Sequence, residues 1–353
     1  MTRSASPSRP LLVRCGAMGD MVLLQPLLAR LAQRYGSPVD VLSSGGWTRP
    51  LLQGQPQVGE ILLLQSRKRP YWISPDQWRM VATLRARPPG PVYFCDDTPQ
   101  TLAILRRGGI GDADRVDAYS AGLREADVSE HWLDRWRTLA ERSPARWPAP
   151  IDSPPPDGFA PRFVVAASDE QDLQDWLTQR GWQESPLVLL QPGNKRTLKH
   201  GTGASRQHHK YWPEAHWAEV AAQVAARSTT AQLLLCGAPP EHDFLEQIHA
   251  ACMARGLTGR VHNLALDLPI PRLMALCARA TGMISIDTGP AHLAASVGCP
   301  LVVLFGAAPP AKWAPRSDRS AVLCVGGDRG RKRVAEIAEA EVIEAWEQLG
   351  TGV

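Results

Sequence analysis

The feature that most restricts the fold of this chain is the alternation of short apolar runs with stretches of helical periodicity. The short run at 39–42 is typical of a buried strand, whereas leucines in 21–35 recur at helical spacing. Strands that alternate with helices form parallel sheets, because each crossover helix covers one face of the sheet. The expected fold class is therefore α/β.

Two series of such elements are expected along the chain. The first has strands at 11–14, 39–42, 60–64 and 92–96 and helices at 21–35 and 75–85. The second has strands at 187–193, 232–237, 283–287 and 301–306 and helices at 169–181, 214–226, 241–255, 270–278 and 291–297. A last helix is expected at 334–349. Gly36 and Gly298 are expected to end the helices that precede them.

The length of the chain indicates two domains. Its 353 residues exceed the roughly 250–300 at which a single core stops growing. The stretch 143–161 is dense in proline, which excludes regular helix and central strand and predicts an extended linker. We expect one domain at 1–160, a second at 161–333, and a closing helix within 334–353.

Composition excludes several classes of protein. The net charge of +4 is small for a nucleic-acid binder, so no nucleic-acid partner is expected. The seven cysteines show no CxxC spacing, which predicts free thiols in a reducing cytoplasm. The first ten residues are polar, so no signal peptide is expected, and no run approaches the ~20 apolar residues of a membrane span. The basic runs 67–69 and 329–333 are expected to be solvated.

The segment 15–20, CGAMGD, joins a predicted strand to a predicted helix. Gly16 and Gly19 suit a tight turn and close approach of a ligand. Asp20 has two interpretations: an acid that stabilises the helix N-terminus, or a general base at the edge of a ligand site. Dinucleotide binding is not expected, because the glycine spacing is not GxGxxG and the next strand ends in serines.

The segment 285–300, SIDTGPAHLAASVGCP, is the most specific stretch. A strand should end at Asp287, and a helix should begin close to Pro290. The free N–H groups of the helix, the Thr288 hydroxyl, the close approach allowed by Gly289 and the His292 ring together suit a diphosphate. In the alternative interpretation, Thr288 is a helix cap and His292 a surface residue.

A basic loop at 191–213 follows a predicted strand and is expected to bind a polyanion. Its five basic side chains are Lys195, Arg196, Lys199, Arg206 and Lys210. The adjacent His208 and His209 are not expected to bind a metal, because the sequence places no third ligand near them.

Four segments in order resemble the heptosyltransferase family of glycosyltransferases. LVRCGAMGDMVLLQPLLARL is similar to the family's N-terminal signature, and KYWPEAHWAEVAAQV to its K-x-W-P segment. LLLCGAPPEHD is similar to its G-x-P-x-E segment. ISIDTGPAHLAASVGCPLVVLFG is similar to its D-[TS]-G-x-x-H-x-A-A signature. The resemblance covers most of the chain.

The resemblance implies a GT-B fold. Two Rossmann-like, doubly wound parallel-sheet domains would face each other across a cleft, and the C-terminal helix would cross back to the N-terminal domain. It implies an N-terminal acceptor-binding domain and a C-terminal domain for the nucleotide-sugar donor. It also implies inverting sugar transfer that requires no cofactor and has no metal site, with at most a non-essential divalent cation.

The resemblance assigns roles to individual residues. Asp20 corresponds to the general base, and Gly16 and Gly19 are the loop glycines near the acceptor. The diphosphate and sugar of the donor would be held by Lys210, Asp287, Thr288, Gly289, His292 and Asn194. The nucleoside would be held by Glu241, which corresponds to an acid that binds ribose, and by main chain near Leu268.

The function implied is transfer of heptose from ADP-heptose to an anionic glycolipid, the lipopolysaccharide core. The enzyme is expected in the cytoplasm, with peripheral contact to the inner membrane through the basic runs 67–69 and 106–107. Two alternatives stay open: another nucleotide sugar such as a UDP-hexosamine or another acceptor, and an inactive paralogue that acts as a binding or assembly subunit. The stretch 66–87 matches no assignable pattern, and the loop before Lys210 is longer and more basic than in the shortest family members, so the acceptor stays open.

Overall fold

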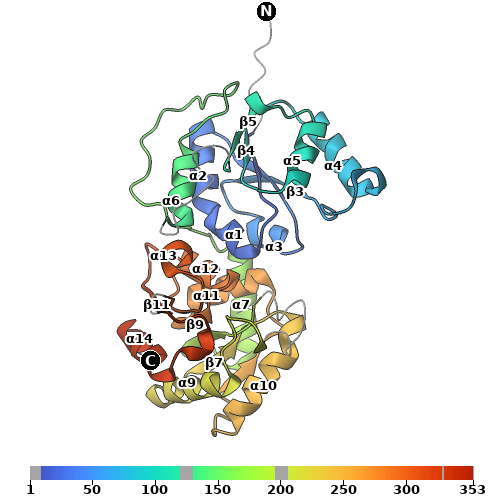
Figure 1. The fold of residues 1–353 in the computed structure, drawn as a ribbon. Helices are drawn as coiled ribbons and strands as arrows, with labels where there is room; N and C mark the ends of the chain where they lie inside the picture. The colour runs from blue at the N-terminus through green and yellow to red at the C-terminus, as the bar shows by residue number, and fades with distance from the viewer. Residues whose placement is uncertain (1–8, 120–129, 195–205, 328–329, 353) are drawn as a thin grey trace, which may run out of the picture. The chain divides into compact units, whose positions relative to one another are not determined.

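The computed structural model describes residues 9–119, 130–194, 206–327 and 330–352. The chain divides into two compact units, Met1–Phe159 and Ala160–Val353. Each unit contains its own parallel β-sheet with helices packed against it (Figure 1). The division lies within the proline-rich stretch that the sequence analysis expected to be a linker.

The first unit has a five-stranded parallel sheet in the order β3-β2-β1-β4-β5. Its strands are β1 Leu11–Val13, β2 Val39–Ser43, β3 Val58–Leu63, β4 Val92–Phe94 and β5 Arg115–Asp117. Its helices are α1 Met18–Leu23, α2 Gln25–Tyr35, α3 Thr48–Leu52, α4 Pro75–Ala86, α5 Pro99–Arg107 and α6 Trp132–Ala140. Short 3₁₀ turns lie at Tyr71–Ile73 and Asp112–Asp114.

The single helix expected at 21–35 is two helices, α1 and α2, which meet at Leu24. Pro26 explains the break, because it has no N–H to donate to a carbonyl in the preceding turn. Gly36 ends α2 with φ 64°, in the left-handed region, as the sequence analysis expected. The break makes α1 a short helix of its own whose first turn carries Asp20.

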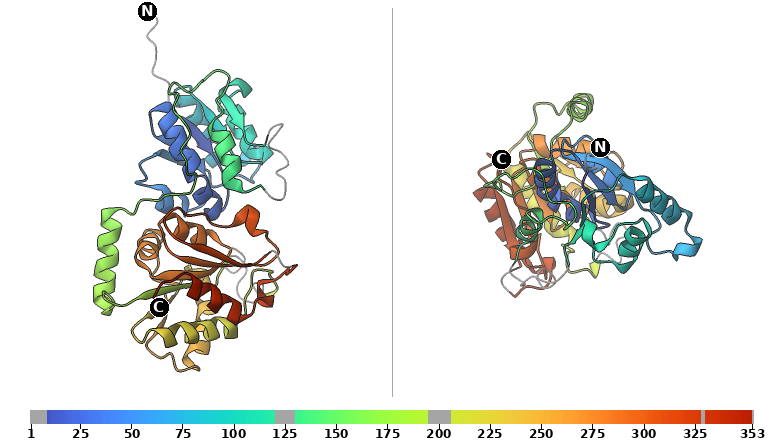
Figure 2. Two further views of the ribbon diagram at one scale, coloured as in Figure 1. Left: turned by 90° about the vertical axis from the view of Figure 1, so that its left-hand side faces the viewer. Right: turned by 90° about the horizontal axis from the view of Figure 1, so that it is seen from above.

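The second unit has a six-stranded parallel sheet in the order β11-β10-β9-β6-β7-β8. Its strands are β6 Leu187–Gln191, β7 Gln232–Leu235, β8 Val261–Asn263, β9 Gly282–Ile286, β10 Leu301–Phe305 and β11 Val322–Gly326. Its helices are α7 Ala167–Arg180, α9 Glu214–Arg227, α10 His242–Met253, α11 Ile270–Arg279, α12 Gly289–Ser296, α13 Pro310–Trp313 and α14 Glu339–Gln348. Short 3₁₀ turns lie at Pro239–Glu241 and Val334–Glu336. Helix α7 packs beside α11 (Figure 2).

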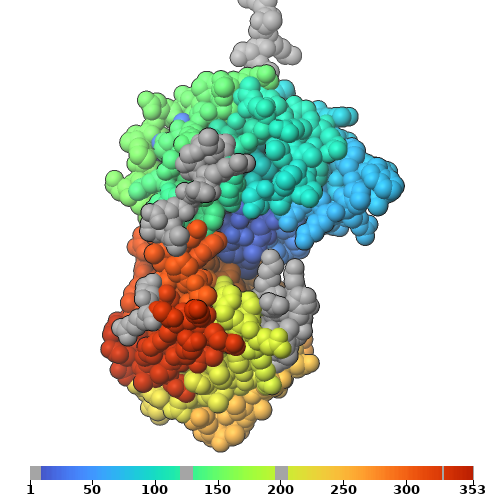
Figure 3. All heavy atoms as spheres, in the orientation of Figure 1, coloured from blue at the N-terminus to red at the C-terminus, as the bar shows by residue number. Residues whose placement is uncertain are grey.

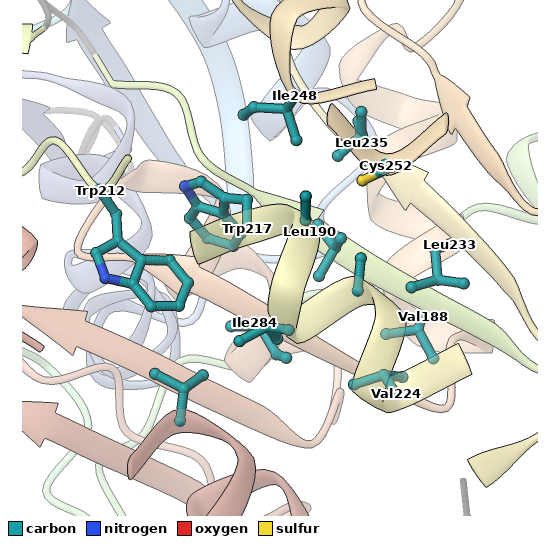
Figure 4. Packing of buried hydrophobic residues seen from close by; sticks show 14 of the residues in the cluster. Val188, Leu190, Trp212, Trp217, Val224, Leu233, Leu235, Ile248, Cys252 and Ile284 are labelled. Carbon is teal, nitrogen blue, oxygen red and sulfur yellow. The ribbon is translucent and has the colours of Figure 1, made fainter. Parts of the chain in front are cut away.

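The core of the second unit joins α9 to the sheet. Trp212 and Trp217 are fully buried against strand residues such as Leu190 (Figure 4). The indole N–H of Trp212 donates to the Ile337 carbonyl at 3.0 Å, which ties the C-terminal segment to the same core. A fully buried tryptophan whose N–H is paired contributes a large apolar area without the cost of an unsatisfied donor.

The C-terminal helix differs from the expectation. In place of one helix at 334–349, a 3₁₀ turn is followed by the shorter α14. Val342, Ile343 and Trp346 of α14 belong to the core of the second unit. The helix lies against α9, so the C-terminal segment and residues 214–227 are neighbours on the surface (Figure 3). Its apolar face therefore packs within the second unit, and contact of the C-terminal segment with the first domain, which the resemblance implies, stays a prediction.

Seven elements were not expected from the sequence: β5, β8, β11, α3, α5, α6 and α13. The three strands lie at sheet edges, β5 in the first unit and β8 and β11 in the second. Edge strands have one exposed side and therefore need fewer apolar residues, so their sequences, such as RVD in β5, carry little periodic signal.

The linker expected from its prolines contains no helix or strand between 141 and 166. Its first part is bound to the first unit. Arg30 is 3% exposed and donates to the Ser153 carbonyl at 2.6 Å, and the Tyr35 hydroxyl donates to the Trp147 carbonyl at 3.0 Å. The first part of the proline-rich segment therefore packs along α2.

Three expectations from composition can be compared with the structure. The seven cysteines form no disulfide with one another, and Cys324 is exposed while the other six are buried. Among the residues that the structure describes, no three His, Cys, Asp or Glu side chains gather as a metal site would require. No helix in the described ranges has the length and apolar character needed to cross a membrane.

Candidate active site

The candidate residues lie beyond the carboxyl ends of strands, where open α/β sheets bind ligands. The order of the strands reverses between β1 and β4 in the first unit and between β6 and β9 in the second. Asp20 follows β1, Asn194 follows β6 and Asp287 follows β9. These three residues are thus at the topological switch points, whereas Glu241 follows β7 and Leu268 follows β8.

Asp20 is the third residue of α1, and its two carboxylate oxygens have different partners. Oδ2 accepts the Ala17 N–H at 2.7 Å, so the side chain stabilises the start of the helix. Oδ1 lies 3.2 Å from Nη2 of Arg14. The side chain is 23% exposed, so it is held in place and still reachable. The geometry of Asp20 therefore agrees with the capping interpretation. The second carboxylate oxygen of Asp20 does not take part in the cap and faces a cation.

Arg14 is a site residue that the sequence analysis missed. Its Nη1 donates to the Cys95 carbonyl at 2.7 Å and to the Tyr119 hydroxyl at 3.0 Å. Burial alone would lower the pKa of this guanidinium, but Asp20 and Tyr119 raise it above its usual value, so it stays a fixed cation. The available signal was a charged residue at the end of an otherwise apolar strand.

Gly16 is required by the closeness of this ion pair. A Cβ at Gly16 would lie 2.6 Å from Oδ2 of Asp20 and 2.9 Å from Nε of Arg14. The backbone of Gly16 does not adopt a positive φ, so the reason for glycine is space and not conformation. Gly19 is the second residue of α1.

A second ion pair, which the sequence also did not reveal, lies beside the first. Asp96 follows β4 and is 2% exposed, and its Oδ2 lies 3.2 Å from Nη1 of Arg67. The same Arg67 nitrogen donates to the Cys15 carbonyl at 3.0 Å, in the loop that leads to Asp20. Burial would raise the pKa of Asp96, but Arg67 and a hydrogen bond from Thr101 hold it below its usual value. Arg67 is thus turned into the protein and is not the solvated residue expected.

In the second unit, Lys210 and Asp287 form a close ion pair. Nζ of Lys210 donates to Oδ2 of Asp287 at 2.6 Å and to its backbone carbonyl at 2.7 Å. Nε2 of His292 lies 4.0 Å from Oδ1 of Asp287. His292 is 5% exposed, which contradicts the alternative interpretation of this residue as a surface histidine. Asp287 therefore organises two basic groups at the end of β9.

The N-terminus of α12 begins directly after Asp287. Thr288 is the N-cap residue in extended conformation, and its side chain makes no capping hydrogen bond to the helix. Gly289 and Pro290 are the first two helical residues. The first-turn N–H groups of a helix have no partner within the helix, so this end can accept an anion. It lies beside the ammonium of Lys210.

Glu241 has the least usual environment of the candidate residues. It ends the 3₁₀ turn after β7, and Oε2 accepts the Ala238 N–H at 2.9 Å. Within the described residues, Oε1 has no hydrogen-bond partner, although the side chain is only 3% exposed. Burial raises the pKa of this carboxyl to about 7. A Cβ at Gly193 would lie 2.0 Å from Oε1, so the carboxylate rests against the backbone that follows β6.

The remaining candidates have less defined surroundings. Leu268 is half-buried in the loop between β8 and α11, next to Asp267, whose Oδ2 accepts hydrogen bonds from Trp176 and Arg180. Asn194 is buried at the end of the described part of the β6 loop. Lys195, Arg196 and Lys199 lie outside the described residues. Arg206 forms an ion pair with Glu214 at 3.0 Å, and Nδ1 of His208 accepts the Lys210 N–H at 3.2 Å.

Comparison with known proteins identifies the class of protein and the family to which this chain belongs. A sequence model of glycosyltransferase family 9 (heptosyltransferase) matches residues 99–342. Lipopolysaccharide heptosyltransferase 3 of Escherichia coli is 30% identical over an alignment that covers 94% of this chain and 96% of the relative. E. coli ADP-heptose lps heptosyltransferase II has the same fold, with a TM-score of 0.74 at 22% identity over 97% of this chain and 98% of that one. E. coli heptosyltransferase WaaC with ADP follows, with a TM-score of 0.69 at 18% identity over 96% and 99%.

The two doubly wound units and the likeness of the whole chain to solved heptosyltransferases show the GT-B fold class. The family model adds that the chain is a glycosyltransferase. More narrowly, the chain belongs to glycosyltransferase family 9, the heptosyltransferase family. The fold class and the family inferred from the sequence are both confirmed.

Proposed function

We propose that this enzyme is an inverting glycosyltransferase that moves a heptose from ADP-heptose to the lipopolysaccharide core. Membership of the heptosyltransferase family is the observation that carries the proposal. The names of its relatives support the sugar, the nucleotide and the acceptor: one is a lipopolysaccharide heptosyltransferase, and another was solved with ADP. No metal or other cofactor is required in this proposal, and a divalent cation is at most non-essential.

The second unit binds the donor in this proposal. The diphosphate lies against the ammonium of Lys210 and the N-terminus of α12, where Thr288 and Gly289 approach it closely, with His292 and Asn194 beside it. Negative charge grows on the diphosphate as the bond to the sugar breaks, and preorganised positive groups stabilise that charge. The ion pair of Asp287 with Lys210 supports this assignment, because it fixes the ammonium next to the helix end.

The nucleoside is held by Glu241 and by main chain near Leu268. The unpartnered Oε1 of Glu241 supports this role, because a ribose hydroxyl can donate to it and remove the cost of a buried, unsatisfied oxygen. The same hydrogen bond favours the ionised form of the carboxyl, which burial disfavours.

Asp20 is the general base in this proposal. Its carboxylate takes the proton from the acceptor hydroxyl as the hydroxyl oxygen attacks the anomeric carbon from the face opposite the diphosphate, so the configuration inverts. One carboxylate is sufficient, because the diphosphate departs as an anion and needs no proton from a second acid. The Arg14 cation and the start of α1 support the role, because they hold the carboxylate in place.

The first unit binds the anionic glycolipid acceptor, with Gly16 and Gly19 in the loop that approaches it. Because such an acceptor is anchored in a membrane, the enzyme works at the cytoplasmic face of the inner membrane by peripheral contact. The exposed basic residues of the first unit support this placement.

Asp20→Asn tests the base. We expect transfer to fall by about 10²–10⁴-fold, while the rise in melting temperature caused by ADP is unchanged. Asp114→Asn is a matched control, because Oδ2 of Asp114 accepts the Gly111 N–H at 3.0 Å in the same capping arrangement. Equal loss of transfer in both variants would make Asp20 a structural cap only.

The alternatives differ in their ligands. A panel of nucleotide sugars, scored by thermal shift, separates ADP-heptose from UDP-hexosamines. Product formed from any of them rules out an inactive paralogue that only binds or assembles. The ADP-bound relative favours ADP-heptose as the first donor to test.

A further inference from the structure

The first unit exposes a cluster of large apolar side chains next to α4. Trp72 is 75% exposed, Ile73 47% and Trp78 45%. These are three of the six large hydrophobic side chains that are exposed in the described part of the chain, and they lie within seven residues. Single exposed apolar residues are ordinary, but a cluster marks a surface that contacts something apolar.

The cluster is held outward by a rigid framework. Oδ2 of Asp76 accepts the N–H groups of Gln65 and Ser66 at 2.9 and 2.8 Å. Nε2 of the buried Gln77 donates to the carbonyls of Ser66 and Arg69, each at 2.7 Å. The loop 65–70 is thus pinned to the first turn of α4, so the aromatic rings beside it cannot be covered by a simple collapse of this loop.

The indole N–H of Trp78 has its partner within the cluster, the Tyr71 carbonyl at 2.7 Å. The polar atom of this ring is therefore satisfied, while nearly half of the side chain is in contact with water. Tyr71 also carries the guanidinium of Arg107 over its ring, 4.4 Å from the centroid.

The charge around the cluster is strongly positive. The stretch 65–87 holds six basic residues and one acid, Asp76, whose carboxylate is turned to the backbone of the loop. Lys68, Arg69 and Arg79 are exposed, and no ion pair engages them within the described ranges. The apolar cluster is therefore bordered by cations, with no acid on the same loop facing the solvent.

We propose that Trp72, Ile73 and Trp78, together with Lys68, Arg69 and Arg79, form a membrane-docking edge that binds an anionic phospholipid bilayer. Tryptophan rings favour the level of the lipid headgroups, and basic side chains near a membrane surface are attracted to anionic lipids by about 1 kcal/mol each. The combination of exposed indoles with exposed cations fits this occupant. The inference rests on the proposed function, in which the acceptor is a glycolipid.

The docking edge is connected to the candidate site of the same unit. Arg67 lies in the pinned loop, and its guanidinium donates to the Cys15 carbonyl and to Asp96. The loop that meets the bilayer is therefore bonded to the loop that leads to Asp20. Docking at this edge brings the catalytic unit to the surface in which the acceptor is anchored.

The test is co-sedimentation of the full-length protein with vesicles of phosphatidylglycerol and phosphatidylcholine, compared with vesicles of phosphatidylcholine alone. We expect binding to the anionic vesicles, weakened by raised salt. Trp72→Ser alone, the triple change Trp72→Ser, Ile73→Ser and Trp78→Ser, and the pair Lys68→Gln and Arg69→Gln should each weaken it, the triple change by about tenfold or more.

Matched controls come from the second unit. Val164 is 52% exposed, and Val164→Ser removes an exposed apolar residue elsewhere; Lys332→Gln with Arg333→Gln removes two exposed cations. Both controls should bind vesicles as the wild type does. The melting temperature of each variant, with and without ADP, reports whether it is folded.

The proposal is overturned if the wild-type protein does not bind the anionic vesicles. It is also overturned if the single and triple variants bind them as well as the wild type does. Binding that appears only when the vesicles carry lipopolysaccharide core glycolipid would also overturn it and would assign the edge to the acceptor. Because the assay uses no sugar donor and no turnover, its failure is distinct from failure of heptosyl transfer.

Discussion

Two acids in this enzyme share one backbone arrangement but have opposite electrostatic surroundings. Asp20 and Glu241 are each the third residue of a helical turn after a strand, and each accepts the N–H three residues earlier. Asp20 faces the guanidinium of Arg14, whereas Glu241 pairs with no cation among the described residues and has a raised pKa. The local sequence sets the shared geometry, and the residues that the fold places nearby decide which charge each carboxyl faces.

We expect Glu241→Gln to stabilise the protein at neutral pH and to weaken ADP binding. Because burial raises the pKa of Glu241 to about 7 from 4.5, its contribution to stability is full below the unfolded pKa and is lost as pH rises through 7. At pH 8 the free energy of unfolding is therefore about 3 kcal/mol lower than it would be with Glu241 protonated. The neutral amide of the variant does not cause this loss. Urea unfolding of both proteins from pH 4.5 to 8 measures it.

The same variant should bind ADP about 10–100-fold more weakly, because the amide makes a poorer acceptor for the ribose hydroxyl. Glu341→Gln is a matched control, since Glu341 also accepts the N–H of the residue three positions earlier, at 3.2 Å, but lies in α14. If Glu241→Gln lowers stability and leaves ADP affinity intact, Glu241 is a structural residue.

Arg14 is expected to position Asp20 and not to bind the donor. We expect Arg14→Gln to lower kcat by about tenfold or more, with ADP affinity unchanged and with partial recovery in Arg14→Lys. Arg87→Gln, which breaks a similarly buried pair with Asp40 at 2.7 Å, is the control for a merely structural loss. A fall in stability equal to that of the control, with kcat retained, would contradict the positioning role.

At the scale of elements, the site depends on how closely neighbouring strand ends approach each other. The loop after β6 and the turn after β7 meet where Gly193 contacts the carboxylate of Glu241. The loop after β1 folds over its own ion pair at Gly16 in the same way. Glycine is needed at both points because side-chain carboxylates occupy the space that a Cβ would take.

We expect Gly193→Ala to lower stability by roughly 1–3 kcal/mol and to weaken ADP binding, because the added methyl group must displace the buried Glu241 carboxylate. Gly46→Ala is the control, since no atom lies within 4 Å of the position of its Cβ. Thermal unfolding and ADP titration measure both effects. An unchanged ADP affinity would show that the carboxylate is not a ligand for the nucleoside.

At the scale of the whole molecule, the second unit contains the complete proposed donor site. Lys210, Glu241, Asp287 and His292 all lie within Ala160–Val353, and the unit has its own core. The C-terminal helix adds Val342, Ile343 and Trp346 to that core. Donor binding should therefore be separable from transfer, which also needs Asp20 of the first unit.

A fragment of residues 160–353 is expected to fold and to gain stability from ADP, without any transferase activity. A fragment of residues 160–338 should fail to fold, because it lacks a fully buried tryptophan and its neighbours in α14. Circular dichroism and thermal shift with ADP distinguish the two. A folded shorter fragment would show that α14 is not part of the core.

The sequence alone determined the fold class, the family and the position of most candidate residues along the chain. Buried parallel strands and amphipathic helices impose periodic patterns. Asp287 follows such a strand directly, and Asp20 and Glu241 lie in the turns that come after one. The edge strands β5, β8 and β11 escaped detection, because an exposed edge does not require an apolar pattern.

Only the tertiary structure decided which charges meet. Arg14 and Asp20 are close in sequence, but Arg67 meets Asp96 and Lys210 meets Asp287 across long stretches of chain. It also placed α14 in the core of the second unit and raised the pKa of Glu241 by burial. Pairing, burial and packing are properties of residues that the fold brings together from distant positions, and a local pattern in the sequence carries no record of them.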